Sequence, residues 1–153
     1  MPSHIVLVED TKSNVVAFER QLSRVIENYE LENRINGMDA IQYITENKEK
    51  IDLVVLDGNL APALIEDKPC HGPDVAAAIL KLNLRIAVWT TDEKMEARFI
   101  KLFTEKGFTN YHVIGRKPCF KEDMEKLMEF AQITPRALSE LSEVCASVGP
   151  RLL

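Results

Sequence analysis

Four short apolar runs and one weaker strand candidate alternate with five amphipathic stretches along this chain, and this alternation is the feature that most restricts its fold. The apolar runs, each as long as a β-strand, are 4–8, 51–57, 84–90 and 111–115, and the weaker strand candidate is 30–35. The stretches that follow them, predicted to be helices, are 11–29, 38–47, 73–82, 92–106 and 121–131. In the stretch 11–29, apolar residues recur with a period close to 3.6, which is typical of a helix with one buried face.

The apolar runs predict a parallel sheet, because strands covered by helices on both faces do not alternate polar and apolar residues. Right-handed crossover connections then restrict the topology to a few doubly wound α/β folds. Pro135 begins a further amphipathic stretch, 135–147, which predicts an extra C-terminal helix. The chain is therefore divided into a folded domain at 1–131 and a C-terminal helical extension at 132–153.

The composition argues against several classes of protein. The 153 residues carry a net charge of -5, whereas a general nucleic-acid-binding protein needs a basic face. No segment has the length of an apolar membrane span, and the first residues lack the basic start of a signal peptide. The three cysteines include no CxxC pair, which favours free thiols in a reducing cytoplasm.

Polar residues stand at the carboxyl ends of the predicted strands. Ligands of an open parallel sheet bind at this edge. The residues found there are Glu9 and Asp10 after the first strand, Asp57 after the third, Thr90 after the fourth and Lys117 after the fifth. We expect these side chains to meet in one pocket at the rim of the core.

Three carboxylates in one pocket predict a bound cation. At ~4 Å and an effective dielectric constant near 20, each pair of like charges costs roughly 4 kcal/mol, and Lys117 offsets only part of this repulsion. Either one acid is protonated or a cation is present. Oxygen ligands that leave positions open for water and phosphate favour Mg²⁺.

The order of these residues resembles the receiver domain of bacterial response regulators. An acidic pair, an Asp, a Thr and a Lys-Pro each follow an apolar strand, and GMDAIQYI (37–44) is similar to the start of that family's second helix. The resemblance covers residues 4 to about 131. It implies a flavodoxin-like fold with strand order 2-1-3-4-5, and a stand-alone receiver, because no output domain follows. Such a module acts in a two-component system or phosphorelay and has at most weak self-phosphotransfer and autodephosphorylation.

The resemblance also implies a phosphoacceptor and a metal site. Asp57 would take a phosphoryl group from a histidine kinase or a histidine phosphotransfer protein. Asp10, Asp57 and the main-chain carbonyl of Asn59 would hold Mg²⁺, and Glu9 would act on that ion through a water molecule. Phosphoryl transfer needs in-line positioning and neutralisation of negative charge, which these groups supply.

Two further residues would respond to the phosphoryl group. Lys117 would pair with one phosphoryl oxygen, and Thr90 would form a hydrogen bond to another. The added charge would draw Thr90 inward and shift the surface near the fourth helix, which changes partner binding. The downstream partner is not indicated by the sequence, and a homodimer is left open.

Two features depart from the family's pattern. The segment APALIEDKPCHG (61–72) is similar to an insertion beside the pocket, because the family's glycine stands several residues sooner than Gly72. A tolerated surface loop is the simpler interpretation, since long loops cost little extra entropy. Ile114 stands three residues before Lys117, where the family often has an aromatic residue. The usual aromatic coupling between Thr90 and the fifth strand is therefore in question.

Two other functions remain open. A pseudo-receiver would only bind partners, although a scaffold has no need for the full set of site residues. VVLDGNL (54–60) is similar to the nucleophile strand of haloacid-dehalogenase-type phosphatases. Those enzymes need a second Asp two residues after the nucleophile, where this chain has Asn59. Fast turnover of a small phosphate ester would favour the phosphatase.

Overall fold

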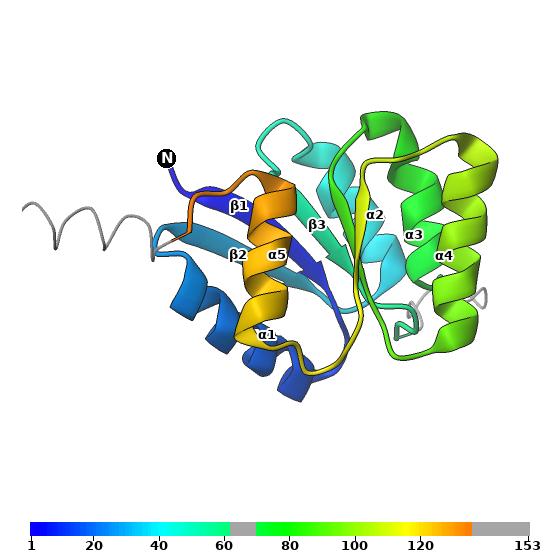
Figure 1. Cartoon of the computed structure of the whole chain (residues 1–153). Helices are drawn as coiled ribbons and strands as arrows, with labels where there is room; N and C mark the ends of the chain where they lie inside the picture. The colour runs from blue at the N-terminus through cyan, green and yellow to red at the C-terminus, as the bar shows by residue number, and fades with distance from the viewer. Residues whose placement is uncertain (62–69, 136–153) are drawn as a thin grey trace, which may run out of the picture.

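Five parallel strands form the centre of the molecule in the order β2-β1-β3-β4-β5 (Figure 1). The computed structural model describes residues 1–61 and 70–135. The strands are β1 (Ser3–Val8), β2 (Tyr29–Arg34), β3 (Leu53–Leu56), β4 (Ile86–Trp89) and β5 (Tyr111–Ile114). The doubly wound fold and the strand order 2-1-3-4-5 are thus confirmed. The predicted helix at 135–147 lies beyond the described residues except for Pro135, and the division at residue 131 stays a prediction.

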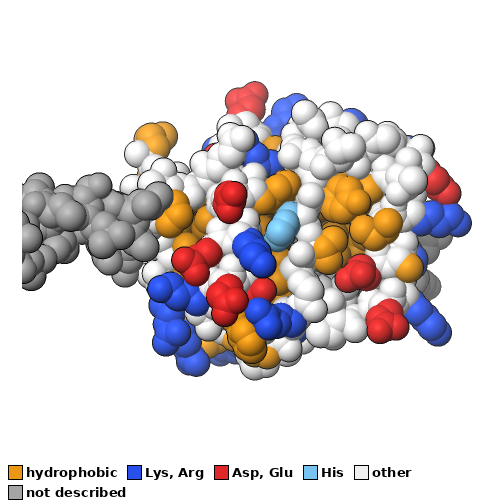
Figure 2. Space-filling model, in the orientation of Figure 1, with side chains coloured by type: hydrophobic (Ala, Val, Ile, Leu, Met, Phe, Trp, Pro, Cys, Tyr) orange, Lys and Arg blue, Asp and Glu red, His pale blue; other side chains and the backbone are white. Residues whose placement is uncertain are grey.

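Helices cover both faces of the sheet (Figure 1). They are α1 (Lys12–Val25), α2 (Gly37–Glu46), α3 (Gly72–Ile79), α4 (Glu93–Lys106) and α5 (Lys121–Ala131). Helices α1 and α5 pack on one face, and α2, α3 and α4 pack on the other. Figure 2 shows apolar side chains exposed between charged ones on the side formed by α4, β5 and α5. Within the described ranges, no helix is both long and apolar enough to span a membrane.

The central strands contribute to both cores, because successive side chains of a strand point to opposite faces. In β1, Ile5 and Leu7 pack with α1 and α5, whereas Val6 and Val8 pack with the helices of the other face. All of these side chains are fully buried. The continuous apolar runs in the sequence are therefore the expected pattern for strands that have no solvent-facing side.

Two predicted helices end earlier than the sequence pattern indicated. Helix α1 ends at Val25, so the prediction of a helix up to residue 29 was wrong. Ile26 has extended backbone angles of φ -128° and ψ 151°, and Tyr29 begins β2. The apolar spacing runs past the helix end because Ile26 and Tyr29 pack in the same core as α1. The last turn of the predicted helix 73–82 is a separate 3-10 helix, η1 (Leu80–Leu82).

Helix α4 has a defined beginning and end. The side chain of Asp92 accepts hydrogen bonds from the backbone N–H groups of Lys94 and Met95, at 2.9 and 3.2 Å, which is the usual arrangement at a helix N-terminus. Gly107 ends the helix in the left-handed conformation with φ 63°, where a residue without Cβ is favoured. Asp92 follows β4 closely, so the start of α4 lies next to the carboxyl edge of the sheet.

Candidate functional site

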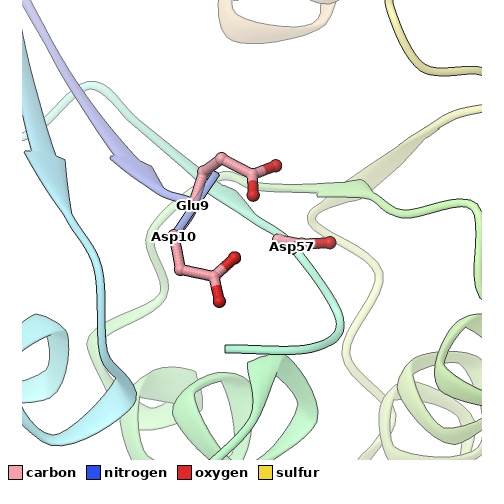
Figure 3. A group of neighbouring side chains, drawn as sticks. All are labelled: Glu9, Asp10 and Asp57. Atoms are coloured by element: carbon pink, nitrogen blue, oxygen red, sulfur yellow. The ribbon is translucent and has the colours of Figure 1, made fainter. Parts of the chain in front are cut away.

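Three carboxylates meet at the carboxyl edge of the sheet. Glu9 and Asp10 follow β1, Asp57 follows β3, and these strands are paired neighbours. One carboxylate oxygen from each acid lies within 4.8 Å of the others (Figure 3). Glu9 is fully buried and Asp57 is 8% exposed, whereas Asp10 is open to solvent. The cluster therefore has a buried floor and one exposed acid at its mouth.

Lys117 joins two of these acids. Its Nζ lies 2.6 Å from Oε1 of Glu9 and 2.8 Å from Oδ1 of Asp57. The side chain comes from the loop after β5, in which the Lys117–Pro118 peptide bond is cis. Among the residues that the structure describes, one ammonium faces three carboxylates, so these residues leave an excess of negative charge when all the acids are ionised.

Glu9 has a hydrogen-bond partner on each oxygen. Its Oε2 accepts from the backbone N–H of Thr11 at 3.1 Å, and its Oε1 accepts from the side-chain amide of Asn14 at 3.4 Å. With Lys117 these donors satisfy a fully buried carboxylate, as burial of a charge requires. Glu9 is therefore an ion-pair partner of Lys117 in this structure. Its expected action on a metal through water stays a prediction.

Asp57 has one oxygen fixed and one available. Its Oδ1 accepts from the backbone N–H of Gly58 at 2.7 Å and from Lys117 at 2.8 Å. Among the residues that the structure describes, no donor is bound to Oδ2. The fixed oxygen sets the orientation of the carboxylate, and the second oxygen is left for a metal or an electrophile.

Thr90 and Asn59 both bind Asp92 rather than Asp57. The hydroxyl oxygen of Thr90 accepts from the backbone N–H of Asp92 at 3.1 Å. The side-chain amide of Asn59 donates to the Asp92 carboxylate at 2.9 Å. This bond from Asn59, aided by the backbone N–H of Met95, holds the pKa of Asp92 below its usual value. The structure thus links both residues to the start of α4, and the predicted roles of the Thr90 hydroxyl and the Asn59 carbonyl remain predictions.

Comparison with solved structures identifies the fold of this chain. No family model and no curated protein matches the chain. It is similar to the phosphorylated cyanobacterial phytochrome response regulator RcpA, with 20% identity, 89% of this chain and 99% of that chain covered, and a TM-score of 0.65. The chain has the fold of response regulator receiver domains. A receiver domain from Pseudomonas fluorescens is 19% identical, with 86% and 95% of the two chains covered and a TM-score of 0.63. The Mn²⁺-bound response regulator Rcp1 is 22% identical, with 84% and 90% covered and a TM-score of 0.56.

The acid cluster of this receiver fold suits a hard divalent cation. Its donors are carboxylate oxygens from three residues, and they lie close enough to share one ion. Oxygen donors favour Mg²⁺ or Mn²⁺ over softer metals. The exposed position of Asp10 gives such an ion access from solvent. The excess negative charge left by Lys117 adds an electrostatic reason for a cation to bind.

Gly72 places the start of α3 directly against the phosphoacceptor candidate of the receiver fold. A Cβ atom on this residue would overlap the backbone carbonyl oxygen of Asp57. The N–H of Gly72 donates to the carbonyl of Gly58 at 2.8 Å, and Ala61 pairs with Asn36. Both ends of the segment 61–72 are therefore attached to the fold, while its residues 62–69 lie outside the described ranges. Its role as an insertion that covers the site stays a prediction.

Trp89 is a site residue that the sequence did not indicate. Its indole N–H donates to the carbonyl of Arg116 at 2.9 Å, and its ring lies below the ammonium of Lys117, with 4.5 Å between Nζ and the ring centroid. Because the side chain is fully buried in an apolar core, the sequence assigns it to packing alone. The one sequence feature that could have indicated its role is its position directly before Thr90, at the end of a strand.

Proposed function

We propose that this chain is a phosphorylatable receiver module in which Asp57 accepts a phosphoryl group from a phosphohistidine. The arrangement of Lys117 between Glu9 and Asp57, beside an acidic cluster that suits a divalent cation, carries this proposal. The similar RcpA structure is of a phosphorylated response regulator, which supports the same reaction class. The donor would be a histidine kinase or a histidine phosphotransfer protein, and the protein would work in the cytoplasm as a signalling module.

The transfer step uses the free oxygen of Asp57. This oxygen attacks the phosphorus atom of phosphohistidine, the P–N bond breaks, and the departing imidazole takes up a proton. The product is an acyl phosphate on Asp57. Lys117 already contacts the other oxygen at 2.8 Å, so a small movement lets its ammonium pair with a phosphoryl oxygen. Neutralising the charge that spreads over the phosphoryl group is the main catalytic requirement of this reaction.

The acids supply the place for a metal ion. Asp10, Asp57 and the main-chain carbonyl of Asn59 would hold Mg²⁺, with Glu9 acting through water. When bound, the ion offsets negative charge on the transferring phosphoryl group. Asp10 is the acid without an ammonium partner in the described residues, whereas Glu9 and Asp57 share Lys117.

Phosphorylation would be read out through Thr90. Its hydroxyl oxygen now accepts from the N–H of Asp92, and a hydroxyl has a proton left to donate. A phosphoryl oxygen on Asp57 offers a charged acceptor for that proton. Because Asp92 also caps α4, movement of Thr90 would change the start of α4 and the partner surface beside it.

A test with a small phosphodonor decides between this function and its alternatives. Incubation with acetyl phosphate and Mg²⁺ should add one phosphoryl group, measured by intact mass. Asp57→Asn should abolish the addition, whereas the matched variant Asp52→Asn should retain it. Asp52 precedes the first residue of β3, and its side chain accepts a hydrogen bond from the backbone N–H of His4, away from the site. An unmodified wild-type protein under conditions that modify a known receiver would overturn the proposal and favour a pseudo-receiver scaffold.

The phosphatase alternative lacks a supporting observation. A second carboxylate two residues after the nucleophile would act as acid and base in such an enzyme, but Asn59 stands there. Its amide is bound to Asp92 at 2.9 Å. We therefore expect no fast turnover of small phosphate esters.

A further inference from the structure

Trp89 stands at the junction of β4 and the reacting residues. It is the last residue of β4, directly before Thr90, and its side chain lies on the face covered by α1 and α5. There it packs against Phe18 of α1, with 5.1 Å between ring centroids. These contacts fix the indole in the core. Groups that bind its N–H or the face of its ring are therefore held in a defined position.

The indole contacts two successive residues of the loop after β5. Its N–H donates to the backbone carbonyl of Arg116 at 2.9 Å. The face of its ring lies 4.5 Å from the Nζ of Lys117. One side chain therefore holds the backbone just before Lys117 and the ammonium at the far end of that lysine. A residue that served only to fill the core would need neither contact.

Support from Trp89 matters because the loop that carries Lys117 is partly open before this residue. The side chain of Arg116 is 46% exposed, and a Cβ atom placed on Gly115 would meet nothing within 4 Å. A lysine has a long, flexible stem that loses about 1.5–2 kcal/mol of rotamer entropy when ordered. An aromatic face beneath the ammonium attracts it and excludes water from one side. The carboxylates of Glu9 and Asp57, at 2.6 and 2.8 Å from the ammonium, then attract it in a less polar environment.

We propose that Trp89 is a positioning residue that holds Lys117 ready for the reaction at Asp57. This inference rests on the proposed phosphoryl transfer for its kinetic consequence, but not for its structural one. The ring fixes the ammonium, the indole N–H fixes the preceding carbonyl, and together they set where Lys117 meets the phosphoryl oxygen. The contacts also give β4 a direct connection to the loop after β5, one that does not pass through Ile114.

Three variants separate positioning from packing. Trp89→Met keeps an apolar side chain of fair size but removes both the ring and the N–H. Trp89→Phe keeps a smaller aromatic face and removes the N–H together with the second ring of the indole. Phe18→Leu is the matched control, because it loosens the same core next to Trp89 and leaves the contacts to Arg116 and Lys117 in place.

Two readouts are measured on each variant. The first is the NMR shift of the ε-CH₂ protons of Lys117, in protein with isotope-labelled lysine and without divalent ions, because an aromatic face shields nearby protons. The second is the rate of phosphorylation by acetyl phosphate at saturating Mg²⁺. Trp89→Met should move the Lys117 signal toward the shift of exposed lysines and slow phosphorylation about tenfold. Trp89→Phe should retain part of the shielding and slow the reaction about threefold.

The control decides the outcome. Phe18→Leu should leave the Lys117 signal in place and change the rate less than twofold, even where it lowers the unfolding midpoint as much as Trp89→Met does. Equal slowing by Phe18→Leu and Trp89→Met, or an unmoved Lys117 signal in Trp89→Met, would overturn the inference. Absence of any phosphorylation in the wild type would instead remove the proposed function, and the NMR shifts would still decide whether Trp89 holds Lys117.

A fluorescence measurement covers the case in which Trp89→Met fails to fold. Trp89 is the only tryptophan of the chain, so the intrinsic emission reports on this side chain alone. Lys117→Met removes the ammonium from the ring and should change the emission intensity, whereas Lys121→Met should not. An emission intensity that is unchanged in Lys117→Met would count against the contact between Lys117 and the Trp89 ring.

Discussion

The ammonium of Lys117 lies 2.6 Å from a carboxylate oxygen of Glu9, which has no exposure to solvent. The same ammonium contacts Asp57, so one cation joins the two acids of the buried floor and offsets part of their charge. This relationship gives Lys117 a place in the folded structure as well as in the proposed reaction. It also explains why the exposed Asp10 is the acid left without a positive partner in the described chain.

Removal of Lys117 should destabilise the protein. Lys117→Met leaves the buried charge of Glu9 without its ammonium, which costs roughly 3 kcal/mol. The double variant Glu9→Gln with Lys117→Met should recover a large part of that loss, because the fully buried charge of Glu9 is removed and only the slightly exposed Asp57 lacks its cation. Urea unfolding midpoints measure both. A double variant as unstable as Lys117→Met alone would show that the ion pair is not the reason for the loss.

A divalent cation should stabilise the wild-type protein through Asp10. At a hundredfold excess of Mg²⁺ over its dissociation constant, the expected gain is ~2.7 kcal/mol, seen as a rise in melting temperature. Asp10→Asn should lose this gain and, in chelator, should melt slightly higher than wild type because like-charge repulsion falls. The control Glu49→Gln removes the same charge from an exposed turn and should respond to Mg²⁺ as the wild type does. Equal responses of the two variants would argue against the metal site.

The close approach of α3 to Asp57 predicts that Gly72 tolerates no side chain. Gly72→Ala places a methyl group against the Asp57 carbonyl and should cost about 2 kcal/mol of stability. It should also slow phosphorylation, because Asp57 has to shift. Gly115→Ala is the matched control, since its new methyl group has open space, and it should be neutral or about 0.5 kcal/mol more stable. Comparable losses in both variants would contradict the packing argument.

The pH dependence of stability should include a contribution from His112. Burial lowers the pKa of this imidazole, and the charge of Lys126 adds to the effect. The unfolded chain therefore binds the proton more tightly than the folded protein does. Stability should fall as the pH drops through the ordinary histidine pKa of 6.5 and on toward the lowered value. His112→Gln should reduce this fall in urea titrations between neutral and mildly acidic pH, and an unchanged pH profile would show that His112 does not contribute.

Much of the fold could be predicted because it depends on burial patterns that a single sequence records. Runs such as 53–56 have no polar face, and that property indicates a parallel sheet covered on both sides. Helix ends were less predictable, since Ile26 and Tyr29 continue the apolar spacing of α1 after the backbone has become extended. Periodicity reports which residues are buried together, not whether the same element carries them.

Some residues of the site could be predicted from the sequence and others could not. Glu9, Asp10, Asp57 and Lys117 are charged residues at strand ends, so topology was enough to place them together. Trp89 could not be found by that argument, because a buried indole under an ammonium has the same sequence signature as an indole that only packs. The bonds of Thr90 and Asn59 to Asp92 depend on side-chain orientations that spacing does not determine.

The most direct measurement locates the phosphoryl group on the chain. Borohydride reduces an aspartyl phosphate to homoserine, and tandem mass spectrometry of the peptides then gives the position. After treatment with acetyl phosphate and Mg²⁺, we expect conversion at residue 57 alone, and none when a chelator replaces the metal. An unconverted Asp57, or homoserine at a different aspartate, would contradict the account.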